Sequence, residues 1–142
     1  MSRHRAKANR WALTLAFVGI LGGLLPSPAH ATLVNVSGLV PKGGSWANYN
    51  TSRCTTGAGK PTLEVQAWAG DNADMYFYIR SSQTNLAIGS YTSSNPRRFP
   101  LHDGTIRGFG TIVVGTCFKI SARKDGFPFA SGSETWTGLL SH

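Results

Sequence analysis

From residue 32 onward the chain consists of short apolar or alternating runs separated by clusters of Gly, Asn, Asp, Ser and Pro, and no run shows a sustained helical period. Alternation with a period of two is the pattern of strands that bury one face, whereas an amphipathic helix repeats every 3.6 residues. About eight short strands with frequent turns predict an all-β fold. The domain is expected to be a small antiparallel β-sandwich or barrel, and the pattern alone is compatible with both.

The clearest pair of predicted strands lies between residues 62 and 81, on either side of a polar turn at residues 70–74. We expect a hairpin in which Ala69 lies opposite Met75, since this register puts apolar pairs on one face and polar or aromatic pairs on the other. Further strands are expected at 33–36, 86–91, 110–114, 117–123 and 134–140. Asp-Gly at 103–104 and at 125–126 predicts two tight hairpin turns.

Residues 1–31 are typical of a cleaved secretory signal peptide, with a basic start, an apolar run at residues 11–25 and the exit Ala29-His30-Ala31. A helix over that run is about 22 Å long, too short for the roughly 30 Å hydrocarbon layer, and Pro26 and Pro28 end it. Cleavage leaves residues 32–142 as a single secreted domain with no membrane contact. These features, with the Gly, Ser and Thr-rich remainder, are typical of exported bacterial proteins.

Export changes what the net charge of +8 means, because four of the 14 basic residues lie in the predicted signal and all six acidic residues follow it. The predicted mature chain therefore carries 10 − 6 = +4. This is an ordinary excess for a secreted domain, and nucleic acid is not an expected partner. The sequence carries no signal for an oligomeric state.

Both cysteines, Cys54 and Cys117, lie in the predicted exported domain, where an oxidising compartment favours a disulfide between them. The alternation of residues 117–123 places Cys117 on the polar face with Lys119, Ser121 and Arg123. Either the disulfide ties the irregular segment 41–60 across a sheet edge, or a bulge at Gly115 turns the cysteine inward. Within that segment, Trp46 and Tyr49 either cap the core or form part of a binding rim.

Motifs of catalysis are incomplete along the whole chain. The run Gly43-Gly44-Ser45-Trp46-Ala47 lacks the last glycine of a nucleophile elbow, and two of the four histidines leave with the predicted signal. We therefore predict no catalytic residue, no cofactor and no metal site. Two alternatives stay open: hydrolysis by a carboxylate pair such as Glu64 and Glu134, and calcium bound by Asp71, Asn72 and Asp74.

The most suggestive functional feature is the second face of the predicted hairpin, where an aromatic strip is expected. The strip comprises Trp68, Tyr76 and Tyr78, flanked by Gln66 and Arg80. Sugar rings stack their apolar C–H faces on aromatic rings and need hydrogen-bonding groups nearby. The leading hypothesis is a non-enzymatic binding protein for cell-wall or extracellular polysaccharide.

Two other classes of function remain as alternatives. The first is a protein-binding effector, such as a protease inhibitor or toxin, that presents the segment 41–60 to an extracellular protein. The second is a small carboxylate-dependent hydrolase using the acids named above. Arg97 and Arg98, close in sequence to Arg107, add either an anion-facing edge or a solvated edge that resists aggregation.

Overall fold

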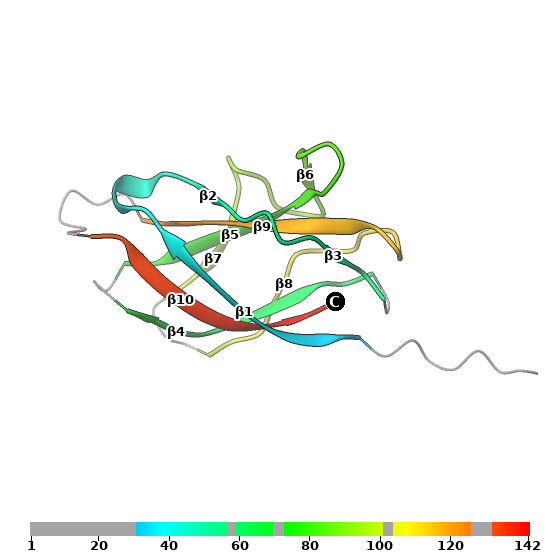
Figure 1. Ribbon diagram of the computed structural model, residues 1–142, viewed down its shortest axis with the longest axis horizontal. Coiled ribbons are helices and arrows are strands. Elements are labelled where there is room, and N and C mark those ends of the chain that lie inside the picture. The colour runs from blue at the N-terminus through cyan, green and yellow to red at the C-terminus, as the bar shows by residue number, and fades with distance from the viewer. Residues whose placement is uncertain (1–30, 57–58, 70–72, 101–103, 126–131) are drawn as a thin grey trace, which may run out of the picture.

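The computed structural model describes residues 31–56, 59–69, 73–100, 104–125 and 132–142, so all but the last residue of the predicted signal peptide lies outside the described residues. The described part folds into two packed antiparallel sheets (Figure 1). This confirms the all-β prediction and selects the sandwich over the barrel. Among the described residues, no helix is both long enough and apolar enough to cross a membrane.

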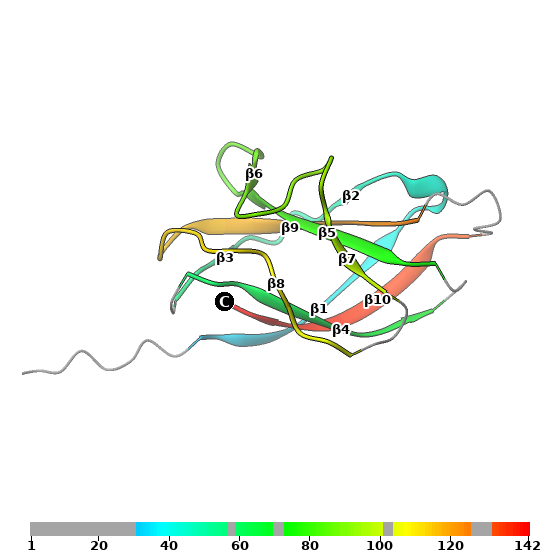
Figure 2. The ribbon, with the colours of Figure 1, turned by 180° about the vertical axis from the view of Figure 1, so that it is seen from behind.

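The four-stranded sheet has the order β1-β10-β4-β8 and forms the lower layer in Figure 1. The other sheet has the order β2-β9-β5-β6, with β3 also paired to β9 and β7 to β5. Figure 2 shows the chain passing from β7 in one sheet to β8 in the other. The strands are β1 (Leu33–Val40), β2 (Ala47–Asn48), β3 (Arg53–Cys54), β4 (Thr62–Ala69), β5 (Met75–Ser81), β6 (Ala87–Ile88), β7 (Arg97–Phe99), β8 (Arg107–Gly108), β9 (Cys117–Lys124) and β10 (Glu134–Ser141), with one 3₁₀ turn, η1 (Lys42–Gly44).

The core lies between the two sheets and is built from the alternate residues that period-two strands turn inward. Its largest side chains are aromatic, and Phe77 packs edge-on against both Phe99 and Trp136, with ring centroids 4.9 and 4.8 Å apart. Offset edge contacts of this kind are the favoured geometry of buried rings. The fold therefore turns the other face of β5 and β9 outward.

The predicted hairpin between residues 62 and 81 is wrong, although both of its strands exist. β4 pairs with β10 and β8, while β5 pairs with β9, β6 and β7, so the two strands belong to different sheets. Both strands are long and alternate apolar with polar or aromatic residues, and each buries its apolar face in the shared core between the layers. A face-to-face arrangement satisfies the same alternation as a hairpin.

A β-bulge in β4 breaks the strict alternation expected there. Thr137 lies opposite Ala67 and Gly138 lies opposite Val65, so Gln66 is the extra residue on its strand. As a result both Gln66 and Ala67 are exposed. A single inserted position of this kind leaves no clear trace in the alternation of side chains.

Several shorter predictions also need correction. Residues 110–114 are not a strand, since Gly110 and Gly115 have positive φ angles of 90° and 82° and enclose a loop. The predicted strand at 86–91 shrinks to β6. Asp103-Gly104 does not join a hairpin, because β7 and β8 lie in different sheets; the turn at 125–126 reaches outside the described residues.

The disulfide joins Cys54 to Cys117 across a separation of 63 residues, as predicted. The two residues are direct partners in the pairing of β3 with β9, which is the first of the two arrangements considered above. The backbone of Thr55 continues this pairing, with its N–H donating to the Thr116 carbonyl at 3.1 Å. The disulfide therefore anchors the segment 41–60 to the outer edge of the six-stranded sheet.

Candidate ligand-binding face

The outward face of the six-stranded sheet is polar and aromatic. Inward and outward side chains alternate along β5 and β9, and the two strands pair so that their outward residues lie side by side. Met75, Phe77 and Ile79 are fully buried, and the residues between them point to the other side of the sheet. On β9 the same alternation brings further polar side chains beside them: Tyr76 pairs with Arg123, Tyr78 with Ser121 and Arg80 with Lys119. Three of the five predicted ligand-binding residues, Tyr76, Tyr78 and Arg80, therefore lie on one surface.

Four side chains cross this face in a row that alternates aromatic and cationic groups: Trp46, Arg123, Tyr76 and Arg98, which we call the aromatic–arginine row. The guanidinium carbon of Arg123 lies 5.0 Å from the Trp46 ring centroid and 5.3 Å from that of Tyr76. Tyr76 is also the register partner of Arg98 on β7. At the spacing of neighbouring strands the row is about 14 Å long.

Stacking between two rings fixes the position of Arg123, since each ring attracts the cation through its electron-rich face. Trp46 makes a further edge contact with Tyr78, at 4.8 Å between centroids. Trp46, Tyr76 and Arg123 are half-buried, whereas the Arg98 side chain is 62 % exposed. The rings are thus held in place and still reach solvent.

The end of the row is set by an ion pair between Arg98 and Asp74. The hydrogen bond and charge of Asp74 raise the pKa of Arg98. Partial burial raises the pKa of the Tyr76 hydroxyl, and the nearby charges of Asp125 and Asp74 raise it further, against the opposing effect of the two arginines. Tyr76 is therefore a neutral hydrogen-bonding group at ordinary pH.

Arg80 lies four residues along β5 from Tyr76 and is almost fully buried, at 6 % exposure. Its Nε donates to the Ser121 hydroxyl at 3.1 Å, one terminal nitrogen donates to the Tyr49 carbonyl at 2.7 Å, and the other donates to the side-chain oxygen of Asn85. All three acceptors are neutral. Together they hold the segment after β2 and the turn after β5 against the sheet.

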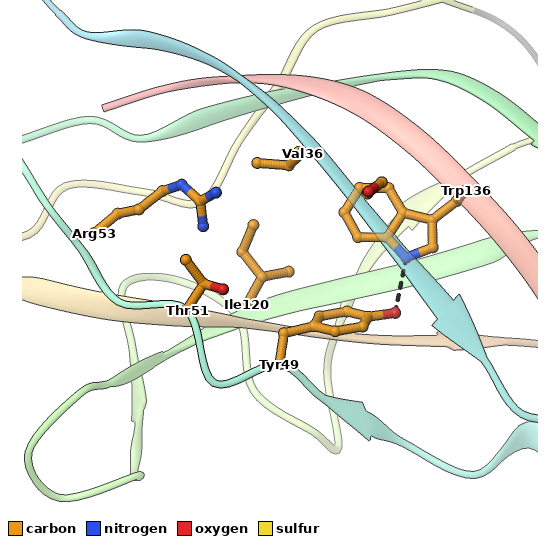
Figure 3. Close-up of a pocket in the computed structure, with 7 residues that line it drawn as sticks. Val36, Tyr49, Thr51, Arg53, Ile120 and Trp136 are labelled. Carbon is orange, nitrogen blue, oxygen red and sulfur yellow. Dashed lines mark hydrogen bonds between the residues drawn. The ribbon is translucent and has the colours of Figure 1, made fainter.

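Tyr49 faces the other way and closes the edge of the sandwich between β1 and the segment after β2. Its hydroxyl accepts a hydrogen bond of 2.8 Å from the indole N–H of Trp136 (Figure 3). The same hydroxyl donates a hydrogen bond of 3.2 Å to the Leu39 carbonyl. Burial raises the pKa of this hydroxyl, against the effect of the Trp136 hydrogen bond. Of the two roles considered for Tyr49, the structure supports capping of the core.

The cavity in Figure 3 lies at this edge and has a volume of about 40 Å³. Such a volume admits a few water molecules and excludes a sugar ring. A second hollow, of about 350 Å³, lies beside the disulfide, and none of the residues that line it has an aromatic ring. Neither space offers the stacking surface that the aromatic–arginine row provides. The cavity of Figure 3 is lined by Val36, Ser37, Tyr49, Thr51, Arg53, Ile120 and Trp136.

We expect Gly38→Ala to destabilise the protein by about 1–3 kcal/mol, because a Cβ at this position would overlap the Tyr49 ring. Urea denaturation of the purified protein measures the change. Ser37→Ala, at the exposed neighbouring position, is the matched control and should alter stability little. Equal stability of the Gly38→Ala variant and the parent protein would contradict the packing of Tyr49 on this glycine.

The remaining predicted site residues are not brought to this face. Gln66 and Trp68 lie on β4 of the other sheet, where Trp68 pairs with Trp136 along the backbone. The expected strip of Trp68, Tyr76 and Tyr78 is therefore not formed by cross-strand neighbours. The side chain of Trp68 lies outside the described part of the structure.

The acidic residues considered for catalysis or calcium binding are also separated. Glu134 is buried beside Lys124, with 3.5 Å between carboxylate oxygen and ammonium nitrogen. Glu64 lies on β4 between the buried Leu63 and Val65, so its side chain points to the opposite face. The two carboxylates thus lie on opposite faces of their sheet and form no catalytic pair. Asp74 pairs with Arg98, whereas Asp71 and Asn72 lie outside the described residues.

Sequence reasoning did not place Trp46, Arg123 and Arg98 together, although it noted each of them. Arg123 could be assigned to the polar face of its strand, and Trp46 was a candidate for a binding rim. Their meeting depends on the pairing of β5 with β9 and β7 and on the placement of β2 beside β9. These long-range pairings leave no local signal.

Comparison with known proteins gave no assignment for this arrangement: no protein-family model matches the chain, and no curated protein is significantly similar to it.

Proposed function

We propose that the protein is exported and that residues 32–142 act outside the cytoplasm as a non-enzymatic binding protein for cell-wall or extracellular polysaccharide. The aromatic–arginine row on the six-stranded sheet is the contact surface, with Tyr78 and Arg80 following Tyr76 along β5. The proposal carries over the polysaccharide hypothesis and replaces Trp68 and Gln66 with Trp46, Arg123 and Arg98.

The observation that carries this proposal is the fixed, half-exposed pair of rings on either side of Arg123. Trp46 and Tyr76 offer apolar faces or edges, and the guanidinium groups between and beside them offer hydrogen-bond donors. A polysaccharide needs this combination along a line, because successive sugar rings repeat the same apolar and polar groups. Rings that are already packed also lose little conformational entropy on binding.

Export is supported by two independent features. Residues 1–31 have the charge, apolar run and small-residue exit of a bacterial signal peptide. The disulfide between Cys54 and Cys117 is typical of proteins that fold in an oxidising compartment.

The proposal predicts that Trp46→Ala and Tyr76→Ala each weaken binding to insoluble polysaccharide by about tenfold, the effect of losing one stacked ring. Pull-down with chitin, cellulose and purified peptidoglycan sacculi measures the bound fraction. Gln66→Ala is the matched control, since Gln66 is exposed on the other sheet and its loss should leave binding unchanged.

Circular dichroism of each variant separates loss of binding from loss of fold. A folded parent protein that binds none of these polysaccharides would overturn the proposal. Unchanged retention of both folded aromatic variants would equally exclude the aromatic–arginine row as the contact surface.

A further inference from the structure

The six-stranded sheet carries like charges in adjacent positions, which is a costly arrangement. Arg80 and Lys119 are direct register partners on β5 and β9, and both belong to the outward set of their strands. Like charges directly opposite each other destabilise a sheet. Arg80 adds a second cost, because a buried guanidinium is ordinarily matched by a carboxylate, whereas its three acceptors here are neutral.

The acidic groups of this face do not offset these charges. Asp74 and Asp125 lie together near the start of β5 and the end of β9, where the Asp125 N–H donates to the Asp74 carbonyl at 2.9 Å. Asp74 is already paired with Arg98. Among the described residues, no carboxylate is in ion-pair contact with Arg80, Lys119 or Arg123.

The cations also occupy both ends of the surface. Arg123 and Arg98 belong to the aromatic–arginine row, and Lys119 on β9 and Arg80 on β5 each lie four residues along their strand from this row. A ligand that lies on the row and then extends along β9 and β5 contacts the rings of Trp46 and Tyr76 and reaches a second set of positive charges. A repeating anion satisfies both ends, whereas a neutral chain leaves the repulsion between Arg80 and Lys119 in place.

From this charge pattern we infer that the ligand is an acidic polysaccharide, one that carries carboxylates along its chain. The inference rests on the proposed function and adds the ligand's chemical class. The carboxylates lie against Lys119 and the exposed guanidinium of Arg98, while the sugar rings stack on Trp46 and Tyr76. Arg80, the register partner of Lys119, contributes a buried charge that solvent screens only weakly.

The test compares two forms of one polymer, polygalacturonate and its methyl-esterified form, which differ in charge along the same chain. Affinity electrophoresis and calorimetric titration of the purified protein give the two affinities. In dilute buffer we expect the charged form to bind more tightly by about tenfold. This preference should disappear as salt rises from about 0.1 M to about 1 M, where the Debye length falls from about 10 to about 3 Å.

Charge-removing variants locate the effect. Lys119→Gln should weaken binding to polygalacturonate several-fold and leave binding to the esterified form unchanged, whereas Arg98→Gln should weaken binding to polygalacturonate more than binding to the esterified form. Lys60→Gln is the matched control, because this exposed lysine directly precedes the four-stranded sheet and its loss removes the same charge. Equal effects of Lys60→Gln and Lys119→Gln would show that net charge alone governs binding and would overturn the inference.

The outcomes separate this inference from the proposed function. Equal affinity for the two polymers would overturn the inference that the ligand is acidic, and the proposed polysaccharide-binding face would still stand. Binding to neither polymer would also overturn the inference, and the pull-down on insoluble polysaccharides then decides the function by itself. Binding of polyglutamate as tight as that of polygalacturonate would show recognition of charge without sugar, which would overturn both.

Discussion

Removal of the disulfide by the double substitution Cys54→Ser and Cys117→Ser is expected to lower the free energy of unfolding by about 4 kcal/mol. The disulfide closes a loop of 63 residues, and a loop of this length restricts the unfolded chain strongly. In the native state it supports β3, whose two residues pair with β9 at the edge of the sheet. Urea denaturation of the oxidised protein and of the double variant measures the difference.

Reductant supplies the control for this prediction. Dithiothreitol should destabilise the parent protein by an amount close to that of the double substitution, and it should leave the double variant unaffected. If the parent protein is as stable after complete reduction as before it, the disulfide contributes nothing to stability. The entropy argument would then fail for this fold.

The fold class and the strands that supply the core follow from the sequence because alternation is a local property. Leu63 and Val65 on β4, like Phe77 and Ile79 on β5, are buried as the period of two predicts. Which strand lies beside which is not local. β4 and β5 were predicted to pair because they are consecutive and complementary, yet each finds its neighbours elsewhere in the chain. The apolar faces of β4 and β5 would lie side by side in a hairpin, whereas in the structure they face each other across the core.

The short strands were beyond sequence reasoning for a related reason. β2 and β3 have two residues each, and they pair with β9 inside a segment that has the composition of an irregular loop. Two residues give no measurable alternation. Their place is determined by the disulfide, by the Tyr49 N–H donating to the Ile120 carbonyl at 3.1 Å, and by Arg80.

The candidate site was predictable to the extent that it depends on one strand. Tyr76, Tyr78 and Arg80 were assigned to one face of β5, and the structure keeps them there. Their neighbours come from β9, β7 and the segment before β2, which replace β4 of the predicted hairpin. The chemistry of the face changes accordingly, from an aromatic strip with one arginine to rings that alternate with arginines.

The buried pair of Lys124 and Glu134 has no counterpart in the sequence prediction, which placed Glu134 at the start of a strand and considered it for a catalytic pair with Glu64. Lys124 is fully buried and Glu134 is 1 % exposed, and the ammonium and carboxylate lie 3.5 Å apart. Two charges taken out of water repay the cost of dehydration only through their interaction with each other and with neighbouring polar groups. Removing one of them leaves the other charge at a buried position.

We therefore expect Glu134→Gln to destabilise the protein by about 3–5 kcal/mol, and Lys124→Met to do so by a similar amount. The double variant, in which both buried charges are gone, should be much more stable than the sum of the two single effects predicts. Urea denaturation of the four proteins completes the double-mutant cycle. Strictly additive losses would show that the two charges do not interact, and a small loss on Glu134→Gln would show that this carboxylate is not needed to balance Lys124.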